Sequence, residues 1–415
     1  MTCIYCFSTG PFTDEHVVPA GLGGDDKDWL LKAAVCGDCN TKTFSPLEAK
    51  VMRASPLAMA RLFFQTRSRN RGARTRAPSI QARVSYFDDP DTGLFLEQEL
   101  GSGGRPMILP QIIVTPPGQM TVTAADVPSA NRLVEEMGSL ADRLTICAKS
   151  RDGPDIRFYL TILAWRQESY TVGETAGQSD APRDAIWLEP LERPATDSIS
   201  ILTPRVFRRK NGSLTCRAAS VADAARLLTA LRTGHADLAV PAGTPGLITG
   251  TPRIHLGQLM DAAAYNRVLT KIAFNLCAHL FGLDAVRTSA FDAARIYART
   301  GTGGVKQWQA EAAKVFADHI PRLPSHHLLL VRLVPPGAGQ AGQVVVLMQF
   351  YGGPIHALIV AEGRSGLPAC PDPILVVVDY EANLIGKLSG EALTIFAAGG
   401  ATGFPSSNDN TKDDE

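Results

Sequence analysis

Two Cys-x-x-Cys pairs near the start of the chain are the sequence feature that most constrains its fold. Cys3 and Cys6 form one pair, Cys36 and Cys39 form the other, and 29 residues lie between the pairs. Each pair can present two thiolates to one side of a zinc ion, and two such knuckles complete a tetrahedral site. In a chain without a secretion signal this spacing is used for metal binding more often than for disulfides. We therefore predict a structural Zn²⁺ that folds the first part of the chain.

A zinc ion held by four cysteines has no open coordination position for water or substrate. Such a site contributes folding free energy and leaves catalysis to other residues. The first 45 or so residues are rich in Cys, Gly and Asp and lack a long apolar period. This composition is expected of a unit that depends on a metal rather than on a large core.

The residues between and beside the knuckles follow a specific order. TDEHVVP contains an acidic pair and His16, a Gly-Gly turn follows, and VCGDCNTK places Asn40 directly after the last cysteine. This order resembles the HNH, or ββα-metal, endonuclease family over about residues 3–50, an eighth of the chain. The resemblance implies an N-terminal HNH nuclease module over residues 1–60, with a ββα-metal fold and the structural zinc.

Hydrolysis of a phosphodiester bond needs a base to activate water, a cation to neutralise the phosphate and stabilisation of the departing oxygen. His16 is the candidate general base, because imidazole titrates near neutral pH. The resemblance implies a catalytic divalent metal, Mg²⁺ or Mn²⁺, held by Glu15 and Asn40, with Asp14 as the alternative carboxylate. Oxygen ligands of this kind suit Mg²⁺.

Several neighbours of the motif have expected roles. The family's middle asparagine has no counterpart, because only Asp28 or Trp29 is available before the second knuckle. Glu48 is expected to cap a helix that begins near residue 45, with approach to the metal as the alternative. The glycines at positions 23–24 are expected to supply a turn without a chemical role. Lys42 is expected to contact a phosphate, with a solvated lysine as the alternative.

A basic segment follows the motif. The chain as a whole is balanced, with 41 Lys and Arg against 41 Asp and Glu. From residue 50 to residue 87, however, there is no acid and there are nine basic residues, namely Lys50, Arg53, Arg61, Arg67, Arg69, Arg71, Arg74, Arg76 and Arg83. We predict that residues 61–85 form a nucleic-acid-binding segment, or alternatively a flexible linker. The phosphate contacts are expected, beside Lys42, from Arg67, Arg69, Arg71, Arg74 and Arg76.

The rest of the chain predicts a multidomain α+β protein of mixed helices and antiparallel sheet. A mixed α/β middle region is expected over residues 86–260, with TVGETAGQSDAPRD as a loop. A C-terminal region over residues 261–400 is expected to hold an amphipathic helix and then an antiparallel sheet made of four apolar, β-branched runs. The acidic tail, residues 401–415, is expected to be disordered.

Two functional hypotheses follow from these features. The first is a metal-dependent endonuclease acting on nucleic acid, expected to be double-stranded DNA. Its C-terminal region would sense, regulate or target through an activating ligand or partner, as in phage-defence effectors. The second is a zinc-dependent nucleic-acid-binding protein without catalysis. A separate enzyme in the C-terminal part has no nucleophile or phosphate-loop signature to support it.

Composition also bears on the setting of the protein. Apolar residues make up 45% of the chain, yet no apolar run approaches the ~18 residues of a membrane span, and no secretory signal is evident. We therefore expect no membrane partner and a cytoplasmic location.

Overall fold

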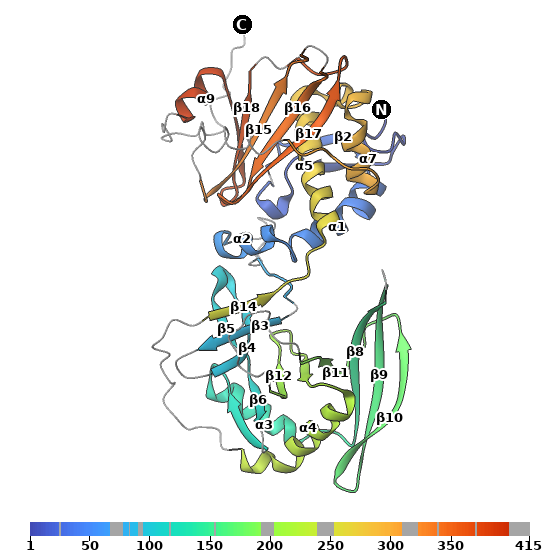
Figure 1. Cartoon of the computed structure of the whole chain (residues 1–415), viewed down its shortest axis with the longest axis vertical. Helices are drawn as coiled ribbons and strands as arrows, with labels where there is room; N and C mark the ends of the chain where they lie inside the picture. Colours follow the sequence, from blue (N-terminus) through green and yellow to red (C-terminus); the bar gives the residue numbers. More distant parts are fainter. Residues whose placement is uncertain are drawn as a thin grey trace. The chain divides into compact units, whose positions relative to one another are not determined.

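Figure 1 shows a computed structural model of the chain, which is an α+β protein with several antiparallel sheets, as the sequence predicts. Its residues fall into two compact units. Unit 1 comprises Met1–Gln81, Ser102–Gly104 and Gln258–Glu415, and unit 2 comprises Ala82–Gly101 and Arg105–Gly257. The structure describes residues 1–24, 26–66, 78–82, 84–89, 94–115, 118–152, 155–191, 203–238, 253–308, 323–337, 340–369 and 372–397.

Unit 1 begins with an antiparallel strand pair, β1 (Phe12–His16) and β2 (Leu30–Cys36), which leads into the π-helical segment η2 (Asp38–Phe44) and the helix α1 (Ser45–Val51). The other described elements of this unit are η1 (Ala20–Leu22), α2 (Pro56–Phe64), η3 (Ser102–Gly104), α5 (Ala262–Phe281), α6 (Leu283–Val286), η5 (Ser289–Phe291), α7 (Asp292–Thr300), β15 (His326–Val334), β16 (Gly342–Gln349), β17 (Ile355–Gly363), β18 (Ile374–Asp379), β19 (Leu384–Ser389) and α9 (Gly390–Ala397).

The C-terminal strands of unit 1 form a five-stranded antiparallel sheet in the order β17-β16-β15-β18-β19. This confirms the antiparallel sheet predicted from the four apolar runs, to which β19 is added. Successive side chains of a strand point to opposite faces of a sheet. Accordingly Leu329 and Val331 join the larger core of the unit, whereas Leu328 joins a smaller core that includes Phe396 of α9.

Helix α5 lies at the centre of the larger core. Its apolar period predicts an amphipathic helix, but every residue from Val268 to Ala278 is buried. The reason is that the same core contains residues of the N-terminal strand pair, such as Val35, and of the C-terminal sheet, such as Val346. In Figure 1, α5 and β2 accordingly lie on one face of the sheet and α9 lies on the other. Among the described helices, α5 included, none is long and apolar enough to cross a membrane.

This shared core changes the domain organisation expected from the sequence. The expected middle region, residues 86–260, lies close to the extent of unit 2. Residues 1–60 and 261–400, expected as two regions, instead lie in one unit. The first residues are thus packed on α5, and their fold does not depend on the metal alone.

Unit 2 contains an eight-stranded sheet in the order β10-β9-β8-β11-β13-β12-β6-β7 and a four-stranded sheet in the order β14-β3-β4-β5. Strand β11 pairs in parallel with β8 and β13, while the other recorded pairs are antiparallel. Its described elements are β3 (Val84–Asp89), β4 (Leu94–Leu100), β5 (Pro106–Ile108), β6 (Gln111–Thr115), β7 (Gln119–Thr123), α3 (Val127–Gly138), β8 (Arg143–Asp152), β9 (Asp155–Arg166), β10 (Ser169–Gln178), β11 (Ile186–Glu189), β12 (Arg205–Arg208), β13 (Leu214–Arg217), α4 (Val221–Gly234), η4 (His235–Asp237) and β14 (Arg253–Gly257).

One local prediction is wrong, and another is confirmed in its position only. The segment TVGETAGQ, expected within a loop, forms most of β10 at the edge of the large sheet. The helix expected near residue 45 does begin at Ser45, but no serine caps it there, because the chain already has helical geometry at Phe44, where η2 runs into α1. A serine cap is found instead at Ser55, whose side chain accepts a hydrogen bond from the amide of Ala58 at the start of α2.

Candidate functional site

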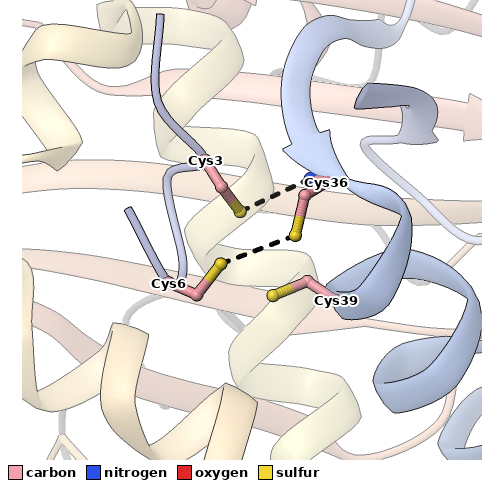
Figure 2. Close-up of side chains that lie close together, drawn as sticks. All are labelled: Cys3, Cys6, Cys36 and Cys39. Carbon is pink, nitrogen blue, oxygen red and sulfur yellow. Dashed lines mark hydrogen bonds between the residues drawn. The ribbon is translucent and has the colours of Figure 1, made fainter. Parts of the chain in front are cut away.

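The four N-terminal cysteines come together as the sequence predicts. Cys3 and Cys6 lie in the turn before β1, Cys36 ends β2, and Cys39 lies in η2 (Figure 2). Their sulfur atoms all lie within 4.8 Å of one another, and the Sγ atoms of Cys6 and Cys36 are 3.5 Å apart. A tetrahedral zinc ion with four ~2.3 Å bonds to sulfur requires sulfur separations of roughly 3.8 Å. The four cysteines therefore fit a single closed metal site.

The surroundings of Cys3 favour its thiolate. The amide groups of Tyr5 and Cys36 donate to Cys3 Sγ at 3.5 Å and 3.4 Å. Together with the Cys39 thiol, which has the largest effect, these donors lower the pKa of the Cys3 thiol to about 4. The thiolate is the form that binds a metal. Because three of the four cysteines are buried and Cys6 is half-buried, the site suits a structural role.

The metal-ligand candidate Asn40 lies directly against β1. Its Nδ2 atom donates to Thr13 Oγ1 and to the backbone oxygen of Asp14, each at 3.0 Å. Asn40 and His16 are half-buried and Asp14 is exposed, so this edge of the strand pair is open to solvent. These contacts bring Asn40, from the helical segment, to the strand that ends at His16.

The side chain of Glu15 does not lie at the solvent-exposed edge of the strand pair. Its side chain is 3% exposed and points into the core, where it forms an ion pair with Lys271 of α5. Asn275, one helical turn further along α5, donates to Glu15 Oε1 at 3.4 Å. Of the two carboxylates considered from the sequence, Glu15 is therefore engaged by the core, whereas Asp14 is the one that stands beside Asn40.

The ammonium group of Lys271 is held between two carboxylates. Besides Glu15, it pairs with Glu48 of α1, and the Lys271 side chain is 2% exposed. Burial lowers the pKa of Lys271, but the carboxylates of Glu48 and Glu15 outweigh it, so that the pKa lies above its ordinary value. The prediction that Glu48 caps a helix is thus wrong, since a buried lysine takes its carboxylate.

The other candidate residues are exposed, buried in the core or outside the described residues. Lys42 is exposed and pairs with Asp38 at 2.7 Å, so a solvated lysine describes it as well as a phosphate contact does. Asp28 is exposed, and the ring of Trp29 stacks on His279 with centroids 4.3 Å apart. The predicted phosphate contacts from the basic segment lie outside the described residues, namely Arg67, Arg69, Arg71, Arg74 and Arg76. The acidic tail also lies outside them.

The turn between β1 and β2 is closely packed. Gly23 has a φ of +78°, and a Cβ atom there would lie 2.3 Å from Tyr380 Cα. A Cβ atom on Gly24 would lie 2.2 Å from the backbone oxygen of Val18. The buried His327 contacts the preceding residue, with its Nε2 atom 3.0 Å from the Leu22 oxygen. The prediction that these glycines serve a turn is confirmed.

Sequence reasoning missed three residues that surround this site: Tyr5, Lys271 and Asn275. Lys271 and Asn275 are four residues apart and so share one face of α5. A lysine and an asparagine inside the most apolar helix of the chain are a sequence signal of buried partners. The sequence does not show that these partners lie more than 200 residues away, as in the pairing of Lys271 with Glu48.

Comparison of the chain with known proteins gave no matching family model, no matching curated protein and no matching solved structure. The resemblance to HNH nucleases therefore rests on the residues of the sequence motif alone.

Proposed function

We propose that β1, β2 and η2 form the catalytic centre of a metal-dependent HNH-type endonuclease that hydrolyses nucleic-acid phosphodiester bonds, with DNA as the expected substrate. One observation carries the proposal. The Asn40 side chain donates to Thr13 and to Asp14, which holds the residue after the second knuckle against the strand that ends at His16. The residue that offers an oxygen ligand is thereby held against the strand that carries the base candidate.

In this proposal His16 is the general base that takes a proton from the attacking water. Both hydrogen bonds of the Asn40 side chain use Nδ2, so Oδ1 is not needed for either. Asn40 Oδ1 and the exposed carboxylate of Asp14 are the oxygens that would hold the divalent metal. The pairing of Glu15 with Lys271 favours Asp14 over Glu15 for this role. Bound Mg²⁺ or Mn²⁺ would supply charge neutralisation at the scissile phosphate.

The four-cysteine site has a separate role. It would hold Zn²⁺ without an open coordination position. Its two knuckles flank the strand pair: one precedes β1 and the other joins β2 to η2. The cysteines thereby fix the spacing between the strand that carries His16 and the segment that carries Asn40.

The test is cleavage of supercoiled plasmid DNA with added Mg²⁺ or Mn²⁺, with RNA as a second substrate. Zinc-loaded wild type is compared with His16→Ala and Asn40→Ala. Asp38→Asn is the control, because Asp38 lies in the same helical segment, is exposed and pairs with Lys42. We expect His16→Ala to lose about 10²- to 10⁴-fold in rate, as is usual for a general base. The control should cut like wild type, and equal cutting by all four proteins would contradict the proposal.

A second function is favoured by one specific observation. The carboxylate that the HNH resemblance singles out, Glu15, is paired with a buried lysine. A zinc-dependent nucleic-acid-binding protein without catalysis would need no free carboxylate at that position. Such a protein would retain nucleic acid after mild EDTA treatment that spares the zinc, and His16→Ala would bind as wild type does. Metal-dependent cleavage by the wild type excludes this alternative.

A further inference from the structure

One side-chain amide connects α5 to the end of β1. Asn275 is 0% exposed, and its Nδ2 atom donates to the His16 backbone oxygen at 3.1 Å and to Glu15 Oε1 at 3.4 Å. The Tyr5 hydroxyl donates to Asn275 Oδ1 at 2.6 Å. Each polar atom of the amide therefore has a partner in the N-terminal part of the chain, although 259 residues separate Asn275 from His16.

These contacts require an amide at position 275. A carboxylate there would face the Glu15 carboxylate and the His16 oxygen, with no hydrogen to donate to either. A leucine of similar size would remove the amide contact from all three groups, and Glu15 would keep only its ion pair with Lys271. An amide accepts at one end and donates twice at the other, which matches one hydroxyl and two oxygens.

The partner on the acceptor side belongs to the zinc knuckle. Tyr5 stands between Cys3 and Cys6 in the chain, and its ring packs on Phe44 and Phe274 with centroids 4.5 Å and 4.9 Å away. The amide of Asn275 thus spans from the first knuckle to the backbone of His16. It reaches the backbone rather than the imidazole.

We propose that Asn275 is a positioning residue for His16, holding the backbone from which the imidazole projects at the end of β1. This inference rests on the proposed nuclease function and adds a residue of α5 to that site. Asn275 does not touch the substrate. Displacement of a catalytic group by roughly 1 Å can lower a rate about 10²-fold, so a single backbone hydrogen bond at the base has a measurable consequence.

The experiment uses the full-length, zinc-loaded chain and three variants. Asn275→Leu removes all the amide contacts, and Tyr5→Phe removes the hydroxyl while keeping the ring. Thr270→Val is the matched control, because Thr270 is buried on the same helix and bonds within it, to the Asn266 oxygen. Steady-state cleavage gives kcat and KM, and histidine-selective ¹⁵N labelling reports the imidazole of His16, assigned with His16→Ala.

Asn275→Leu is expected to lower kcat about 10- to 100-fold, the usual range for residues that orient a catalytic or metal-binding group. Tyr5→Phe should lower kcat less. In both variants KM should stay within about twofold of wild type, zinc should stay at one per chain, and the His16 resonance should move. Thr270→Val should leave kcat and the resonance unchanged. Should Asn275→Leu fail to fold, Tyr5→Phe decides by the same two readouts.

Failure of the inference and failure of the proposed function give different results. Wild-type kcat in folded, zinc-loaded Asn275→Leu overturns the inference and leaves the nuclease intact. An unmoved His16 resonance in that variant overturns it whether or not the protein cuts. If wild type does not cut nucleic acid but the resonance moves in Asn275→Leu and Tyr5→Phe alone, the positioning contact stands and the nuclease proposal fails.

Discussion

Among the described residues, each unit of the protein has a buried cation held between two carboxylates. In unit 1, Lys271 pairs with Glu15 and Glu48. In unit 2, Arg217 of β13 is 1% exposed and pairs with Glu97 and Glu189, and its Nε and Nη2 atoms bond the two Glu97 oxygens at 2.7 Å and 3.1 Å. The two clusters are alike in charge and burial, so neither property by itself marks a functional site.

The neighbours of the two cations differ. The guanidinium of Arg217 lies over the rings of Tyr86 and Phe207, inside the sheets of unit 2. Lys271 is followed one turn later by Asn275, which bonds the backbone of His16 beside the open edge of β1. A buried ion pair therefore indicates a functional site only when its neighbours position a candidate catalytic residue.

The largest difference in stability between the two units is expected when the metal is lost from unit 1. Cys36→Ser removes one ligand of the cluster in unit 1, whereas Cys216→Ser changes a buried, free cysteine of unit 2. Structural zinc contributes on the order of 10 kcal/mol of folding free energy in small domains. We expect Cys36→Ser to lose zinc and to lower the melting temperature of unit 1, as measured by elemental analysis and calorimetry. Full zinc content in Cys36→Ser would contradict the cluster.

Removal of the cation should destabilise both units similarly but affect activity in one. Lys271→Met removes the cation from Glu15 and Glu48, and Arg217→Met removes the cation from the buried Glu97, while Glu189 keeps Arg209. Breaking a buried ion pair in this way costs about 3–5 kcal/mol. Denaturant unfolding followed by tryptophan fluorescence separates the effects, because Trp29 and Trp308 lie in unit 1 and Trp165 and Trp187 in unit 2. Under conditions where both variants are folded, Lys271→Met should lower cleavage and Arg217→Met should not. Equal activity would make both clusters purely structural.

The turn between β1 and β2 gives a matched pair of glycine substitutions. Gly23 and Gly212 have φ values of +78° and +87°, but only at Gly23 would a Cβ atom meet backbone, that of Tyr380, while nothing lies within 4 Å at Gly212. Gly212→Ala should therefore lose about 1 kcal/mol from backbone strain. Gly23→Ala should lose roughly 1–3 kcal/mol more from overpacking. Equal losses of stability in thermal unfolding of the two variants would show that Tyr380 does not constrain this turn.

A pH effect is expected from His327. Its Nε2 atom lies 3.0 Å from the Leu22 oxygen, and its Nδ1 atom accepts from the Tyr351 amide at 3.4 Å, an arrangement that requires the neutral ring. Burial lowers the pKa of His327 to about 3, against about 6.5 in an unfolded chain. The unfolded state therefore binds the proton first. Stability is fully present above pH 6.5 and falls as the pH drops below it, by ~1.4 kcal/mol per pH unit.

Unfolding between pH 7 and 5 in excess zinc should show at least this slope for wild type, because burial also lowers the pKa of His279, His326 and His356. His327→Gln should show about one proton less than wild type. An identical slope in the variant would mean that His327 does not titrate on unfolding. Working above pH 5 with added zinc limits the contribution from protonation of the cysteines.

Local patterns were sufficient for a defined part of this molecule. The cysteine spacing predicted the metal cluster, and apolar periods predicted α5 and the strands β15 to β18. Strand β10 was not predicted because most of its side chains are exposed on both faces, which removes the period-two signal of a half-buried strand. Patterns of this kind report on residues within one element and its nearest neighbours.

Contacts between distant segments could not be predicted in the same way. The sequence shows that Lys271 and Asn275 interrupt an apolar helix, but not that Glu15 and His16 are their partners. For the same reason the resemblance favoured Glu15 as a metal ligand, because the lysine that pairs with it lies far along the chain. Which carboxylate is open to solvent depends on this long-range packing.

We propose that two metal sites with different roles share the N-terminal strand pair, one closed by four cysteines and one open beside Asp14, His16 and Asn40. The most direct test is titration of the zinc-loaded chain with Mn²⁺, followed by the electron paramagnetic resonance signal of free Mn²⁺. We predict one bound Mn²⁺ per chain in wild type and in Asp38→Asn, and weak or no binding in Asn40→Ala, with zinc unchanged in all three. Absence of Mn²⁺ binding in wild type, or equal binding in Asn40→Ala, would contradict the claim.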